Sequence, residues 1–237
     1  TAVSKMVSAR IARGQYKNSL RILKASMVYA AAAGGLAAAV MWFGADLFAK
    51  AMQMPYSSYA LRTLAPTIWV MAFLGVLRGY FQGTGTMVPT AVAQIIEQII
   101  NAAVSIGAAW ILFQEGLKVN LVRGDTEYAY AFGAAGGTIG TGAGALAALL
   151  FCGFLMVNYW KTLKRRCRKD RTGKTESYGR LAGILTMTIL PIVLSSTVYN
   201  ISSVLDNFIF GQGMAYLGQN EVIATQWGVF RKYHTLF

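Results

Sequence analysis

The chain has 237 residues, of which 55% are hydrophobic and 13% are charged, and this composition excludes an ordinary soluble domain. The formal net charge is +13. The cationic residues gather in alternate loops, a distribution that indicates membrane topology and argues against a nucleic-acid partner. With one histidine and two cysteines, the sequence contains no zinc-ligand set, no Ser/His/Asp triad and no disulfide framework. We therefore expect no enzyme activity, no bound metal and no organic cofactor.

Five apolar runs are each long enough, at roughly 20 residues or more, to cross a bilayer as a helix. They are residues 26–48, 61–82, 88–113, 131–160 and 181–210. The sequence opens with Thr1 in a stretch typical of the end of an earlier helix, and a further apolar segment, 222–230, lies near its last residue. The predicted fold class is an all-α polytopic membrane protein, of which this sequence is expected to be a fragment.

Positive charge indicates on which side of the membrane each loop lies. Cations precede the first complete span and gather again between the fourth and fifth spans. They are Lys5, Arg10, Arg13, Lys17, Arg21 and Lys24, then Lys161, Lys164, Arg165, Arg166, Arg168, Lys169, Arg171, Lys174 and Arg180. The alternate loops are near neutral or acidic, so the pattern follows the positive-inside rule. The first complete span is therefore predicted to run outward from the cytoplasm, with the basic loops in contact with anionic lipid.

Small residues recur every fourth position in the span 131–160, a spacing that lets helix backbones approach closely within a membrane. The pairs are Gly133/Gly137, Gly136/Gly140 and Gly140/Gly144. Two prolines, Pro66 and Pro191, fall inside predicted spans, where each bends the helix or frees a backbone carbonyl. We expect close helix packing from the glycines.

Polar residues form one line along the third span. Gln94, Glu97, Gln98 and Asn101 occupy positions i, i+3, i+4 and i+7, which share one face of a helix. A carboxylate is costly in lipid, so this face is expected to meet protein, water or a ligand. It is either the lining of a transport path or a polar contact within a helical bundle. Arg78, near the cytoplasmic end of the preceding span, is expected to reach water or an anionic headgroup.

A second polar line follows the fifth span. Ser196, Asn200, Ser203 and Asn207 occupy positions i, i+4, i+7 and i+11, and Asp206 lies on the adjoining line. Asp206 is either a functional carboxylate or a structural cap near the outer membrane surface.

Three stretches of the sequence resemble a known family. They are TAVSKMVSARIARGQY, TLAPTIWVMAFLGVLRGYFQGTGTMVPTAVAQIIEQIIN and PIVLSSTVYNISSVLDNFIFGQ. The chain resembles the multidrug/oligosaccharidyl-lipid/polysaccharide exporter superfamily, within it the branch of stage V sporulation protein B and the lipid II flippases. The resemblance implies a MATE-like bundle of two six-helix lobes. Residues 1–160 would form the N-terminal lobe from the end of helix two to helix six, 161–180 a basic cytoplasmic inter-lobe loop, and 181–237 the start of the C-terminal lobe.

The resemblance also implies a function. It is transport, in the bacterial cytoplasmic membrane, of an undecaprenyl-pyrophosphate-linked saccharide such as lipid II by alternating access, for cell-wall or spore-cortex synthesis. The candidate substrate- or ion-binding residues are Arg78, Gln94, Glu97, Gln98, Asn101, Asn200, Ser203, Asp206 and Asn207. A coupling ion, H⁺ or Na⁺, would drive the cycle. The alternatives are a MATE-type multidrug or cation antiporter, and a non-transporting scaffold that docks wall-synthesis proteins on residues 161–180.

Overall fold

The computed structural model describes residues 2–51, 56–123, 127–170 and 175–216, and helices account for nearly all of them. The helices are α1 (Ala2–Ala12), α2 (Tyr16–Ala51), α3 (Ser57–Gly83), α4 (Val88–Arg123), α5 (Glu127–Lys169) and α6 (Tyr178–Tyr216). Five of them, α2 to α6, are long and apolar enough to cross a membrane. The all-α polytopic fold class is therefore confirmed. The segment 222–230 lies outside the described residues.

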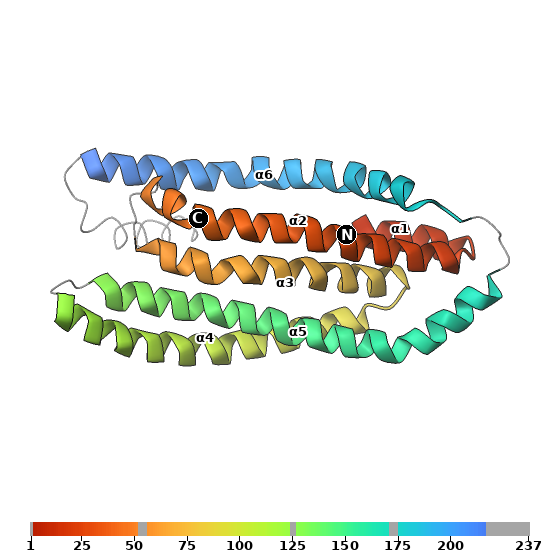
Figure 1. Cartoon of the computed structure of the whole chain (residues 1–237), viewed down its shortest axis with the longest axis horizontal. Coiled ribbons are helices and arrows are strands. Elements are labelled where there is room, and N and C mark those ends of the chain that lie inside the picture. Colours follow the sequence, from red (N-terminus) through yellow and green to blue (C-terminus); the bar gives the residue numbers. More distant parts are fainter. Residues whose placement is uncertain (1, 52–55, 124–126, 171–174, 217–237) are drawn as a thin grey trace, which may run out of the picture.

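The helices lie side by side along one long axis (Figure 1). Helices α2 and α3 occupy the middle of the bundle, with α4 and α5 on one side and α6 on the other (Figure 1). The main contacts join α4 to α5, α2 to α3 and α3 to α5, whereas α6 packs against α2 and α1. This arrangement places the two predicted polar lines, on α4 and α6, on opposite sides of the bundle.

Two glycines make the tight turns at the end of the bundle that the loop charges predict to be cytoplasmic, which we call the cytoplasmic end, with the opposite end called the outer end. Gly14, between α1 and α2, has φ +71°, and Gly85, between α3 and α4, has φ +91°. Both φ values fall in the left-handed region of backbone conformation, which residues with a Cβ rarely adopt. The turns bring α1 onto α2 and α3, where Val7, Ile22 and Tyr80 are fully buried in a shared apolar core. The outward faces instead expose large apolar side chains, as expected of helices surrounded by lipid.

Helix α5 packs closely on α4 through Gly136, Gly140 and Gly144, as two of the three predicted glycine pairs indicated. The prediction is wrong for the pair Gly133/Gly137, because a Cβ on Gly137 would meet nothing within 4 Å. A Cβ on Gly136 would lie 2.6 Å from the backbone carbonyl of Ala108 on α4, and one on Gly144 would lie 2.6 Å from the carbonyl oxygen of Glu97. Gly140 packs directly against Ser105 of α4. Because the obstructing atoms are mainly backbone, only glycine permits this separation of α4 and α5.

Helix α5 differs from its expected end. It continues to Lys169 rather than stopping at Trp160, so the first half of the loop expected over residues 161–180 is helical. Lys, Arg and Leu favour helix formation, and one side of the extension is buried, since Leu163 packs into the apolar core. Pro66 and Pro191 each remain inside one continuous helix, α3 and α6 respectively.

Candidate functional site

A buried ion pair joins α3 to α4. Nη2 of Arg78 lies 2.5 Å from Oε2 of Glu97, and the two side chains are only 15% and 10% exposed. Arg78 stands near the cytoplasmic end of α3 and Glu97 in the first third of α4, so the pair lies in the cytoplasmic half of the bundle. Both were predicted as site residues, but the sequence treated Arg78 as directed to water or a headgroup. The structure directs it to the carboxylate.

The guanidinium keeps part of its hydrogen-bonding capacity unused. Nε of Arg78 is buried and has no hydrogen-bond partner among the described residues. The thiol of Cys152, on α5, lies beside the same guanidinium. On α4, Oγ1 of Thr90 is also buried without a partner in the described part of the chain. Thr90 precedes Glu97 by two helical turns, so both project from the same face of α4. The Nε–H group of Arg78 could therefore donate a hydrogen bond to an oxygen atom of a ligand.

The polar line on α4 divides into two groups. Glu97 is buried, and Asn101 is half-buried against Gly144 of α5. Oγ of Ser105 lies 2.9 Å from the side-chain oxygen of Asn101 and 2.9 Å from a carbonyl oxygen of α5. Gln94 and Gln98 are exposed, because they lie on the edge of the line farther from α3 and α5. Part of the line, Glu97 and Asn101, is therefore a polar contact within the bundle, whereas Gln94 and Gln98 form an exposed polar surface.

The second polar line is not joined to this ion pair within the described residues. Asn200 and Asp206 are exposed, and Nδ2 of Asn200 donates to the backbone oxygen of Ser196 at 2.7 Å. The side chains of Ser203 and Asn207 lie outside the described residues. Asp206 stands in the last third of α6, near its outer end, whereas Glu97 is close to the cytoplasmic start of α4. The two carboxylates therefore occupy opposite halves of the bundle.

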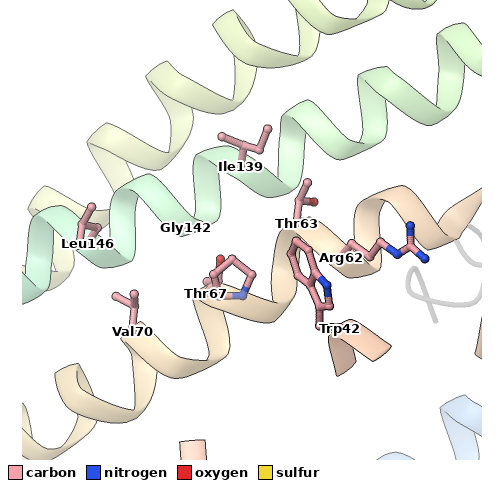
Figure 2. A pocket seen from close by; sticks show the side chains of 9 residues that line it. Trp42, Arg62, Thr63, Thr67, Val70, Ile139, Gly142 and Leu146 are labelled. Atoms are coloured by element: carbon pink, nitrogen blue, oxygen red, sulfur yellow. The ribbon is translucent and has the colours of Figure 1, made fainter. Parts of the chain in front are cut away.

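A pocket of about 380 Å³ opens between α3 and α5 in the outer half of the bundle (Figure 2). It is lined by Trp42, Arg62, Thr63, Pro66, Thr67, Val70, Ile139, Gly142 and Leu146. The Thr63 hydroxyl pairs with the hydroxyl of Thr138 on α5, and Gly142 leaves room for Thr67. Arg62 extends away from these threonines and binds Asp46 of α2 at 2.6 Å (Figure 2). The sequence indicated only Pro66 here, because single threonines in a span carry no distinctive spacing.

Two acidic residues hold the linker between α5 and α6 to the cytoplasmic turn between α1 and α2, an arrangement we call the cytoplasmic clasp. Oδ2 of Asp170 accepts the backbone N–H of Lys17 at 2.9 Å, at the start of α2. The carboxylate of Glu176 binds Arg10 at 3.1 Å, and its backbone N–H donates to Asn18 at 3.0 Å. The sequence missed this contact, since both acids stand among many cations.

Removing the Glu176 carboxylate should weaken the clasp and loosen the linker between α5 and α6. We expect Glu176→Ala to cost about 1–3 kcal/mol of local stability, because Arg10 loses a charge-assisted hydrogen bond in a partly buried position. Tryptic cleavage between residues 170 and 178 should then become several-fold faster. Glu115→Ala, which removes an exposed partner of Lys118 on α4, is the matched control and should leave cleavage unchanged. Equal cleavage of both variants would contradict the role of the clasp.

Five helices of bilayer length, with a charged pair enclosed between two of them, define a multi-pass helical protein of the cell membrane. Residues 1–106 match the sequence model of the MatE family. This match and the relatives below confirm the predicted resemblance to the multidrug/oligosaccharidyl-lipid/polysaccharide exporter superfamily.

Three proteins of Bacillus subtilis (strain 168) are similar to the chain. Stage V sporulation protein B is 29% identical over 95% of this chain and 40% of its own length. Lipid II flippase MurJ is 30% identical over 58% of this chain and 27% of its own length. Uncharacterized membrane protein YabM is 31% identical over 65% of this chain and 26% of its own length. The chain thus spans less than half of each relative. No solved structure matches it.

Proposed function

We propose that the protein containing this chain is a flippase-type transporter of lipid-linked saccharides, with lipid II, an undecaprenyl-pyrophosphate-linked saccharide, as its substrate. The observation that carries the proposal is the enclosed Arg78–Glu97 pair in the cytoplasmic half of the bundle. The name of the relative Lipid II flippase MurJ supports the choice of substrate.

An ion pair inside a membrane bundle calls for a functional explanation. Taking two charges out of water costs more than their attraction returns unless further hydrogen bonds are made, so apolar residues would serve packing equally well. A guanidinium matches the oxygens of a phosphate through paired N–H groups. In this proposal Glu97 neutralises Arg78 while the site is empty. The substrate diphosphate then replaces the carboxylate, which is freed to bind a coupling ion, H⁺ or Na⁺.

The transport cycle proposed is alternating access between two lobes. In this proposal the N-terminal lobe contains residues 1–160 and the extension of α5 to Lys169, the rest of 161–180 joins the lobes, and 181–237 begin the C-terminal lobe. The clasp supports a hinge at the cytoplasmic surface, because it ties the linker to the α1–α2 turn. Rocking about a membrane-embedded site is how helical-repeat transporters commonly expose it to either side. Asn200 and Asp206, exposed on α6, would face the path between the lobes, whereas Gln94 and Gln98 are exposed on α4, on the opposite side of the bundle from α6.

The test is exposure of lipid II at the outer face of cells that depend on the whole protein. We expect the double variant Glu97→Ala/Asp206→Ala to lower exposure at least tenfold. Glu115→Ala, an exposed carboxylate at the outer end of α4, should leave it unchanged. Normal exposure in the double variant would show that neither residue works in transport. Normal exposure after depletion of the protein would reject lipid II as its substrate.

The buried carboxylate also favours a second candidate, the MATE-type antiporter of cationic compounds. Glu97 would then bind a cationic drug or its coupling proton. Arg78 would pair with Glu97 while neither is bound. Efflux of cationic dyes that requires Glu97, together with unchanged lipid II exposure, would decide for the antiporter.

A further inference from the structure

An apolar groove opens on the surface between α2, α3 and α5. Its volume is about 410 Å³, and it lies in the cytoplasmic half of the bundle. The lining residues are Met27, Leu77, Gly153, Met156, Val157 and Trp160. None of them carries a charge, and only the indole of Trp160 has a polar atom. A groove of this chemistry and position suits a hydrocarbon chain rather than a saccharide.

The groove owes its depth to Gly153. A Cβ at this position would meet nothing within 4 Å, so the missing side chain leaves open space along α5. Leu77 of α3 is buried and forms the floor, whereas Val157 is 74% exposed at the rim. Gly153, Val157 and Trp160 follow one face of α5 at i, i+4 and i+7. The groove therefore runs along the helix toward the cytoplasmic surface.

A lysine stands at the cytoplasmic end of each of the two helices that flank the groove. Lys164 is one turn beyond Trp160 on the same face of α5, with Nζ 5.7 Å from the centre of the indole ring. Lys24 is one turn before Met27 on α2, and both lysines are exposed. Neither forms an ion pair within the described residues, whereas Arg10, Arg78 and Lys118 are each paired with a carboxylate.

We propose that this groove is a binding site for an anionic phospholipid of the cytoplasmic leaflet. One acyl chain lies along Leu77, Gly153 and Val157, and the headgroup phosphate lies between Lys24 and Lys164. Lysine stems extend along apolar surface and place their ammonium groups at headgroup depth. The anionic surface of this leaflet attracts basic residues there, an effect equivalent to about fivefold in affinity for each lysine. Neither Arg78 nor Glu97 lines the groove, so the site is separate from their ion pair.

The test is native mass spectrometry of the whole protein with phosphatidylglycerol and phosphatidylcholine of identical acyl chains. We expect phosphatidylglycerol to bind at least tenfold more tightly. Lys24→Gln/Lys164→Gln should abolish this preference and leave weak, equal binding of both lipids. Gly153→Leu should reduce binding of both, because its side chain fills the groove. The leucine suits a helix and meets open space, and circular dichroism will verify the fold.

Lys50→Gln provides the matched control, since it removes an exposed lysine from the outer end of α2. This variant should keep the full preference for phosphatidylglycerol. Equal binding of the two lipids by the unaltered protein would overturn the proposal. So would a loss in Lys50→Gln as large as that in the double variant. Undecaprenyl phosphate is the third probe, and if it binds in a Gly153-dependent manner while phosphatidylglycerol does not, the groove holds a polyprenyl chain and the phospholipid assignment is wrong.

Discussion

Replacing Glu97 with alanine is expected to lower the free energy of unfolding by about 3–5 kcal/mol. Arg78 would remain as an uncompensated charge between α3, α4 and α5, with a side chain only 15% exposed to solvent. Reversible unfolding in mixed micelles measures this loss. Asp46→Ala is the control, because it breaks the exposed Arg62–Asp46 pair and should cost no more than about 1 kcal/mol. Equal losses in the two variants would contradict the buried pair.

Replacing both partners separates stability from function. We expect Arg78→Met/Glu97→Leu to recover most of the stability lost in Glu97→Ala, since apolar residues of similar size replace a buried pair at little cost. Transport should remain abolished, because no guanidinium is left for a phosphate. A double variant that is stable and still transports lipid II would show that the pair is purely structural.

Gly136→Ala is expected to destabilise the bundle by about 1–3 kcal/mol, because the added methyl group meets the backbone of Ala108 at 2.6 Å. Helix α4 must then move away from α5, its main partner. The adjacent residue supplies the control, since a Cβ on Gly137 meets nothing within 4 Å. Gly137→Ala should therefore be neutral or stabilising by up to about 1 kcal/mol, the difference in helix propensity.

The same unfolding measurement distinguishes the two glycine variants. If both lost stability equally, the contact between α4 and α5 would not be as close as the structure has it. A lipid II exposure assay adds a second readout. Gly136→Ala displaces the helix that carries Glu97 and should lower exposure, whereas Gly137→Ala should not.

The sequence alone determined the elements of this protein and the type of several contacts. Five apolar runs predicted five membrane-length helices, because the thickness of the bilayer sets the length of an apolar helix. The glycine spacing in α5 predicted a close helix contact, and Glu97 was expected to face away from lipid. Each of these predictions concerns the position of a residue within its own helix. The spacing of residue types along the sequence is sufficient to predict such positions.

Only the tertiary structure decided which residues meet. Arg78 and Glu97 lie on helices joined by a turn, and their contact depends on how α3 and α4 dock. The polar line of α4 divides because α5 covers Asn101 and leaves Gln94 and Gln98 exposed. Asp170 and Glu176 bind residues more than a hundred positions away in the sequence, at the α1–α2 turn. Helix periodicity describes one helix at a time, whereas these pairings depend on the rotation and depth of each helix against its neighbours.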